Sequence, residues 1–284
     1  MILVPSSQEL DLRDYAAVKS YFDAHRPDCI VHAAGRVGGI QANIREPVAF
    51  LVDNLDMGRN VVIAAKASGV TRLINLGSSC MYPRNASNPL TEDMILQGEI
   101  EPTNEGYALA KIVIARLCQY IRRENPALLY KTLVPCNIYG PHDKFDPAHS
   151  HMVPAVIRKI HLAMQSGADE VEVWGDGVAR REFMYAGDLA DCVFRAIQEL
   201  DSMPDVMNVG VGEDHSVNEY YAVIAGIIGY RGRFVHDLRK PVGMARKLVS
   251  TGRAEAWGWR ATTLLTDGIK KTYEFYLEQY KNAA

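Results

Sequence analysis

The chain has 284 residues, 48% of them hydrophobic, and a formal charge of −3 at pH 7. This length is enough to bury a full core, and it predicts one large domain or two unequal ones. The near-neutral charge, with Lys and Arg dispersed along the chain, gives no indication of a nucleic-acid or acidic membrane partner, and no apolar run approaches the roughly 20 residues that span a bilayer.

Two further features favour the cytoplasm. The first residues show no charged leader followed by an apolar segment. The five cysteines lack Cys-x-x-Cys spacing, which favours free thiols over a disulfide framework or a zinc site. We therefore expect a cytoplasmic protein that holds no metal.

Strands and helices alternate in the first half of the chain. Hydrophobic periodicity predicts strands at 29–34, 71–76 and 130–134, and helices at 15–25, 47–68 and 107–123. This alternation predicts βαβ units and an α/β fold of the Rossmann type, whose doubly wound parallel sheet lies in residues 1–150.

The first residues depart from that pattern. Residues 1–5 predict the end of a strand, but the first strand, the Gly-x-x-Gly-x-x-Gly turn and the helix that would hold a cofactor pyrophosphate are missing from the chain. Because the first strand of such a sheet is central, its loss would leave unpaired backbone groups in the core, each costing ~1–3 kcal/mol. We favour a longer natural polypeptide as the explanation; a re-paired N-terminal segment or a gap filled by another chain are the alternatives.

The composition changes after Asn137. Prolines and histidines mark long loops, and the elements that follow are short. Helices are predicted at 153–164, 188–200, 217–228 and 263–280, with strands at 171–174 and 206–209. These elements predict a smaller α/β substrate-binding lobe in residues 151–284, partly interwoven with the sheet.

A candidate catalytic pair lies on the helix that begins near Tyr107. Tyr107 and Lys111 are separated by one helical turn and share a face. A cation about 4 Å from the phenol would be worth roughly 4 kcal/mol at an effective dielectric of ~20, so we expect the pKa of Tyr107 to fall toward neutrality. Ser78 follows the predicted strand 71–76, at the sheet edge where such folds bind ligands. The three side chains predict a site for a carbonyl oxygen.

Five further segments surround this set in the sequence: 36–40, 77–83, 101–105, 137–143 and 150–154. Together with Ser78, Tyr107 and Lys111 they resemble the GDP-L-fucose synthases, in the extended, sugar-nucleotide branch of the short-chain dehydrogenases/reductases. The resemblance runs from about residue 9 to the C-terminus.

The resemblance implies NADPH-dependent 3,5-epimerisation and 4-reduction of GDP-4-keto-6-deoxy-D-mannose to GDP-L-fucose. Tyr107 would donate the proton to C4, with Ser78 polarising the oxygen and Lys111 supporting the phenol. Cys80 and His151 match the positions that move protons at C3 and C5. A ketone acidifies its neighbouring C–H groups, so a base and an acid on opposite faces of the ring suit this chemistry.

The resemblance also implies binding residues and a partner. Three positions, Lys159, Trp174 and Arg181, match substrate contacts. The residues expected to line the NADP site are Leu76, Gly77, Ser78, Ser79, Lys111, Pro135, Cys136, Asn137, Ile138 and His151. In similar proteins, helices corresponding to 47–68 and 107–123 form a four-helix homodimer interface.

Two departures leave alternatives open. Val242 replaces an expected aspartate that would contact the guanosine or its ribose, which predicts a loss of ~1–3 kcal/mol in binding. Pro5, Ser6 and Ser7 stand where an arginine would meet the 2′-phosphate, so the sequence does not support NADP over NAD locally. A non-catalytic remnant that binds a nucleotide sugar or a partner subunit therefore remains an alternative, as does an enzyme for a related GDP-deoxysugar such as the colitose precursor.

Overall fold

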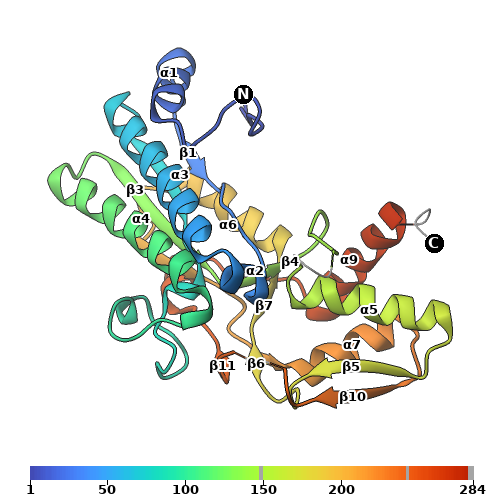
Figure 1. Cartoon of the computed structure of the whole chain (residues 1–284). Coiled ribbons are helices and arrows are strands. Elements are labelled where there is room, and N and C mark those ends of the chain that lie inside the picture. Colours follow the sequence, from blue (N-terminus) through green and yellow to red (C-terminus); the bar gives the residue numbers. More distant parts are fainter. Residues whose placement is uncertain (147–149, 241–242, 281–284) are drawn as a thin grey trace.

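The main sheet has four parallel strands in the order β1–β2–β3–β8 (Figure 1). The computed structural model describes residues 1–146, 150–240 and 243–280. The strands are β1 (Ile30–His32), β2 (Arg72–Leu76), β3 (Leu129–Pro135) and β8 (Val206–Val209). With its covering helices, the sheet forms the expected Rossmann-like α/β fold.

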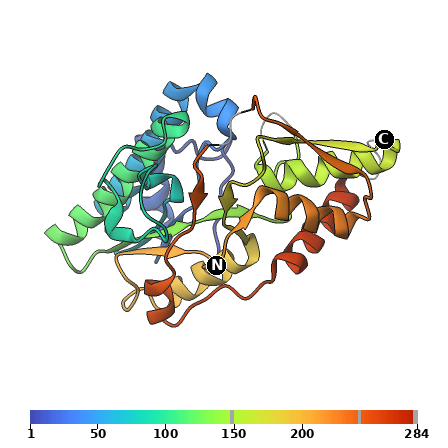
Figure 2. The same ribbon diagram turned by 90° about the horizontal axis from the view of Figure 1, so that it is seen from below.

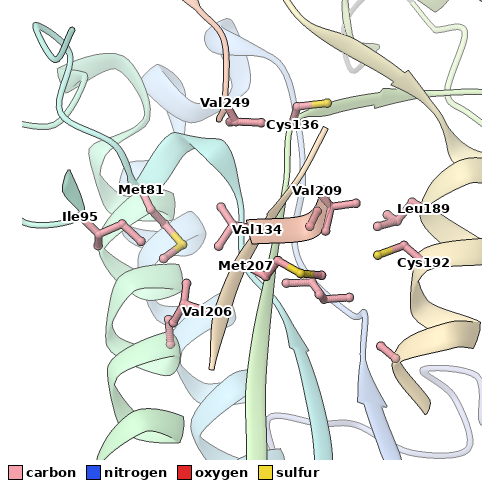
Figure 3. Packing of buried hydrophobic residues seen from close by; sticks show 14 of the residues in the cluster. Met81, Ile95, Val134, Cys136, Leu189, Cys192, Val206, Met207, Val209 and Val249 are labelled. Atoms are coloured by element: carbon pink, nitrogen blue, oxygen red, sulfur yellow. The ribbon is translucent and has the colours of Figure 1, made fainter. Parts of the chain in front are cut away.

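Helices cover both faces of this sheet. Figure 3 shows Leu189 and Cys192 on one side of the strands that carry Val134 and Met207, with Met81 on the other side. The helices around the sheet are α1 (Tyr15–His25), α2 (Ile40–Arg45), α3 (Pro47–Ala67), α4 (Glu105–Glu124), α6 (Ala186–Gln198) and α8 (Gly252–Ala256). Side chains that are fully buried on both faces hold the layers together.

Local signals fix several helix ends. The Asp14 side chain accepts hydrogen bonds from the backbone N–H groups of Ala16 and Ala17, which caps α1. Pro47 begins α3, where its missing N–H costs nothing. Ser216 and Glu219 form a capping box at the start of α7 (Val217–Ile228).

A second lobe lies beside the sheet. Figures 1 and 2 show α5 (Met152–Ser166), α7 and α9 (Leu265–Tyr280) grouped on one side of the molecule, away from α3 and α4. In this lobe β5 (Glu170–Trp174) pairs in parallel with β10 (Arg233–Asp237). Its own buried cluster includes aromatic residues of α7 and α9.

Short strands connect the two lobes. In one small sheet β6 (Arg180–Arg181) lies between β11 (Arg246–Lys247) and β9 (His215–Ser216). In another, β4 (Asn137–Tyr139) pairs with β7 (Phe183–Tyr185). These strands run from the edge of the main sheet toward the second lobe, so they position side chains between the two.

The strand predicted for residues 1–5 is wrong. These residues have no strand structure, and Met1, Ile2 and Val4 are almost fully exposed. A strand needs a partner, and within the described residues β1 pairs with β2 alone. The expected penalty for unpaired groups in the core does not arise, because β1 lies at the edge of the sheet and Ile30 and Val31 are only half-buried.

No helix in the described part of the chain combines the length and the apolar character needed to cross a membrane.

Candidate active site

The end of β2 positions Ser78 and Cys80. The backbone N–H of Gly77 donates to the carbonyl of Leu133 at 2.7 Å, and a Cβ at Gly77 would lie 3.3 Å from that carbonyl oxygen. The chain then enters a 3₁₀ turn, Ser79–Met81, and Ser78 Oγ accepts a hydrogen bond from the backbone N–H of Cys80 at 3.2 Å. The hydroxyl and the thiol are therefore held on one short, well-fixed turn.

Helix α4 brings Tyr107 and Lys111 to the same place. The Lys111 ammonium donates to the carbonyl of Leu76 at 2.9 Å, and Nζ lies 5.8 Å from the centroid of the Tyr107 ring. The Ser78 hydroxyl hydrogen bonds to the Tyr107 phenol. Ser78, Tyr107 and Lys111 thus converge at the carboxyl end of β2, as the spacing of the sequence predicts.

The expected fall in the pKa of Tyr107 is wrong. Burial raises the pKa of the Tyr107 phenol, negative charge on Cys80 adds to the rise, and the Ser78 hydrogen bond partly opposes it. Burial also lowers the pKa of Lys111, to about 8. Desolvation sets the direction of both shifts, in place of the attraction that the sequence argument considered alone.

Two side chains that the sequence analysis did not assign contact the Cys80 sulfur. Asn104 Nδ2 donates to Sγ at 3.1 Å, and Lys247 Nζ donates at 3.4 Å. Asn104 stands in segment 101–105, which carries the family resemblance, whereas Lys247 lies outside the five segments; their contacts with Cys80 join parts of the chain that are distant in sequence.

His151 immediately precedes α5 and is exposed to solvent. The protein around it nevertheless lowers the pKa of the imidazole by burial, and Asp143 opposes this effect. The positive charge of Lys247 lowers the pKa of His151 further, so the same ammonium acts on both Cys80 and His151.

This architecture matches a known family over most of the chain. Residues 4–210 match the model of the NAD dependent epimerase/dehydratase family. The chain belongs to this family. It is 54% identical over 280 residues to the GDP-L-colitose synthase of Yersinia pseudotuberculosis, with 99% of this chain and 91% of that protein covered. It is 51% identical over 276 residues to the GDP-L-fucose synthase of Azorhizobium caulinodans, with 97% and 88% covered.

A solved structure extends this comparison. The GDP-mannoheptose C4 reductase from Campylobacter jejuni, a structure with NADP bound, matches with a TM-score of 0.87 and 31% identity, and the match covers 96% of this chain and 89% of that one.

Lys111 and the segment Pro135–Ile138 fit the role expected of them in an NAD dependent epimerase/dehydratase, which is to hold the nicotinamide end of the cofactor. A Cβ at Gly35, just after β1, would lie 3.0 Å from Asn54 Oδ1 and 3.8 Å from Lys111 Nζ, so the backbone after β1 passes close to the ammonium. An ammonium has three N–H donors, and the described contacts use one of them. Lys111 therefore retains donors for ribose hydroxyls.

The segment expected to close the nicotinamide site, Pro135–Ile138, leads from β3 into β4. Its backbone is fixed to β8, because the N–H of Cys136 donates to the carbonyl of Val209 at 2.9 Å. Asn137 Nδ2 donates to the carbonyl of Glu182, also at 2.9 Å. For the pyrophosphate end, no glycine turn between a strand and a helix precedes β1 among the described residues.

The three predicted substrate positions fall into two groups. Lys159 and Trp174 lie together in the second lobe: Lys159 Nζ donates to the carbonyl of Glu172 at 2.9 Å, and Trp174 Nε1 donates to its carboxylate at 2.7 Å. Trp174 is 42% exposed, and Lys240 Nζ lies over its ring, 5.4 Å from the centroid. Arg181 lies apart from them on β6, beside Lys247 of β11.

Of the two departures from the family pattern noted in the sequence, only the one at Pro5, Ser6 and Ser7 lies in the described part of the chain. Val242 lies outside the described residues. Pro5, Ser6 and Ser7 are described, lie at the exposed start of the chain and carry no cationic side chain.

Proposed function

We propose that the protein is an NADPH-dependent oxidoreductase and epimerase that converts GDP-4-keto-6-deoxy-D-mannose to GDP-L-fucose. The observation that carries this proposal is the convergence of Ser78, Tyr107 and Lys111 at the end of β2, with Cys80 two residues from Ser78. The relatives named GDP-L-fucose synthase and the NADP-bound reductase support the same reaction class.

In the reduction, Ser78 and Tyr107 hold the C4 oxygen of the sugar. The phenol, kept protonated by burial, donates its proton to this oxygen. NADPH, when bound, supplies the hydride to C4. Lys111 and the segment Pro135–Ile138 orient the nicotinamide ribose and ring beside the substrate.

In the epimerisation, protons leave and return at C3 and C5. Each C–H bond is weakened by the adjacent C4 ketone, and the resulting enolate oxygen is held by the same Ser78 and Tyr107 hydroxyls. Cys80 acts as the base and His151 as the acid on the opposite face of the ring. His151 is exposed, so after delivering its proton it can take up another from water.

The substrate's nucleotide end would extend into the second lobe. We assign Arg181 to the diphosphate, where its guanidinium can make paired hydrogen bonds. In the second lobe, we assign Lys159 to charge pairing with the nucleotide and Trp174 to stacking on its base. The sheet of residues 1–150 would then serve the cofactor and residues 151–284 the sugar nucleotide, with α6 and β8 returning to the sheet.

The test is to mix the protein with GDP-4-keto-6-deoxy-D-mannose and NADPH and to follow absorbance of the reduced cofactor. We expect oxidation of one NADPH per sugar and GDP-L-fucose as the product. Absence of oxidation at high enzyme concentration would refute the proposal, and calorimetry with NADPH alone would then distinguish a binding protein from one that lacks cofactor affinity.

A related GDP-deoxysugar is a second candidate substrate. The 54% identity to a GDP-L-colitose synthase exceeds the 51% identity to a GDP-L-fucose synthase. Both reactions would use the same catalytic set, so the rate with each ketosugar and the mass of each product decide between them.

We also propose a homodimer that forms through α3 and α4. These helices border a groove of about 550 Å³ whose lining is mostly apolar but includes Arg59 and Arg116. On α4, Leu109, Val113 and Tyr120 follow helical spacing and are 37–51% exposed. Helix pairs from two copies would bury this face as a four-helix interface.

The cytoplasm is the proposed compartment, because all five cysteines are free thiols.

A further inference from the structure

The contact between Lys247 and Cys80 carries an inference beyond the catalytic set above. Lys247 is only 9% exposed, and its Nζ donates to Cys80 Sγ at 3.4 Å. Asn104 Nδ2 donates to the same sulfur at 3.1 Å. The other amide atom, Asn104 Oδ1, is buried without a hydrogen-bond partner among the described residues. The sulfur therefore receives two N–H donors, one of them charged.

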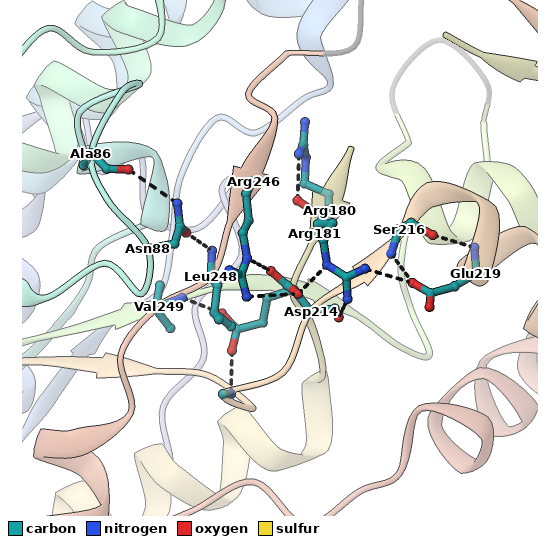
Figure 4. Close-up of polar contacts among 12 residues, drawn as sticks. Ala86, Asn88, Arg180, Arg181, Asp214, Ser216, Glu219, Arg246, Leu248 and Val249 are labelled. Carbon is teal, nitrogen blue, oxygen red and sulfur yellow. Dashed lines mark hydrogen bonds and ion pairs between the residues drawn. The ribbon is translucent and has the colours of Figure 1, made fainter. Parts of the chain in front are cut away.

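The pairing of β11 with β6 aims Lys247 at this position. The strands are parallel, with Arg246 opposite Arg180 and Lys247 opposite Arg181. Arg180 Nε and Arg246 Nε each donate to the buried Asp214 carboxylate, at 2.7 and 2.5 Å, as Figure 4 shows. Because successive side chains of a strand alternate, Lys247 points away from Asp214 and toward Cys80.

A purely structural role does not explain this lysine. Burial of an ammonium is costly unless an anion accompanies it. Among the described residues, no carboxylate lies within ion-pair distance of Lys247, whereas Asp214 pairs with both neighbouring arginines. The sulfur of Cys80 is the group that Lys247 contacts, and it can become an anion by losing a proton.

We propose that Lys247, together with Asn104, is a positioning residue of the epimerisation: the two donors orient Cys80 Sγ and stabilise negative charge on it. The inference rests on the proposed function of the same site. In the step, a C–H bond beside the ketone breaks and an S–H bond forms, while the electron pair moves to the C4 oxygen as an enolate. His151 returns a proton to the carbon from the other face, so no net oxidation or reduction occurs.

The first test measures the sulfur itself and needs no substrate. Cys80 is alkylated with iodoacetamide at a fixed pH near neutrality, and the modified peptide is quantified by mass spectrometry, with C80S as the blank. Burial raises the pKa values of the other four thiols, Cys29, Cys118, Cys136 and Cys192, so they react slowly. Loss of a charged hydrogen bond should slow alkylation of Cys80 in K247M by roughly tenfold or more.

The second test measures proton transfer without reduction. GDP-4-keto-6-deoxy-D-mannose is incubated in D₂O without NADPH, and deuterium incorporation at C3 and C5 is followed by mass spectrometry. K247M should lose exchange by about tenfold or more, and K247R, which restores the cation, should recover most of it. K270M removes an exposed lysine of α9 and should behave as the wild type.

The outcomes separate the two proposals. Wild-type rates of alkylation and exchange in K247M would overturn the role of Lys247. If K247M does not fold, N104A carries the same test, because it removes the neutral donor alone; unchanged alkylation and exchange in N104A would then overturn the inference. If the wild type neither exchanges nor reduces this sugar, the proposed function fails, while the alkylation rates still decide whether Lys247 activates Cys80.

Discussion

At the scale of the residue, desolvation decides the state of the catalytic groups. The sequence places a lysine one turn from Tyr107, and Coulomb attraction alone would make the phenol acidic. In the folded protein, burial raises the pKa of Tyr107 and lowers that of Lys111. The phenol therefore remains protonated, which is the form that a proton donor needs.

Substitution of Tyr107 tests this role. Y107F removes the proton donor but keeps the ring, so NADPH oxidation should fall ~10²–10⁴-fold. Tyr15 lies on α1 and is 38% exposed, which makes Y15F a control that should retain the wild-type rate. A Y107F protein that keeps more than about a tenth of the rate would show that another group donates the proton.

His32 provides a pH-dependent prediction at the same scale. Burial, assisted by the charge of Lys111, lowers the pKa of His32 to about 3. The unfolded chain then binds more protons than the folded one between pH ~6.5 and ~3, so the free energy of unfolding decreases as the pH falls through this window. The loss should reach roughly 4 kcal/mol near the lower end.

H32F cannot take up that proton, so its free energy of unfolding should depend less on pH. Urea unfolding of both proteins at several pH values in this window measures the difference. Parallel curves for the wild type and H32F would contradict the prediction.

At the scale of the element, the contact between α3 and α4 depends on a glycine. A Cβ at Gly58 would lie 2.6 Å from Ile114 Cγ1. The steric cost of overpacking, ~1–3 kcal/mol, exceeds the gain of about 1 kcal/mol from better helix propensity. G58A should therefore be destabilised by up to about 2 kcal/mol in urea unfolding.

Gly226 in α7 is the matched control, because a Cβ there meets nothing within 4 Å. G226A should gain up to about 1 kcal/mol from helix propensity alone. In the G58A/I114A double variant the clash is removed, so its destabilisation should be less than the sum of the single variants. Additive effects would show that the two positions do not touch.

The elements also show where sequence patterns suffice. Strand 206–209 and helix 217–228 are observed with the predicted bounds, and the helix is fixed locally by its capping box. The short strands β6 and β11 escaped prediction, because two residues carry no periodic signal and their pairing joins positions 66 residues apart. Residues 1–5 show the converse, since a β-prone run without a partner forms no strand.

At the scale of the whole molecule, the face formed by α3 and α4 predicts association. V113E places a charge at a position of α4 that is 48% exposed and lies within the proposed interface. Sedimentation velocity should show a dimer for the wild type and a shift toward monomer for V113E, because burial of an unpaired carboxylate is unfavourable. Val178 lies outside this face and is 63% exposed, so V178E should remain dimeric.

By itself, the sequence determined the order of strands and helices in the first sheet and the positions of Ser78, Tyr107 and Lys111. These features follow from local periodicity and from spacing along one helix or one turn, which short-range physics controls. Only the tertiary structure decided that Lys247 contacts Cys80 across 167 residues, and that burial raises the pKa of Tyr107. The contact and the raised pKa depend on which distant segments pack together and on how much water they exclude. The spacing of residues within a motif does not determine either of these.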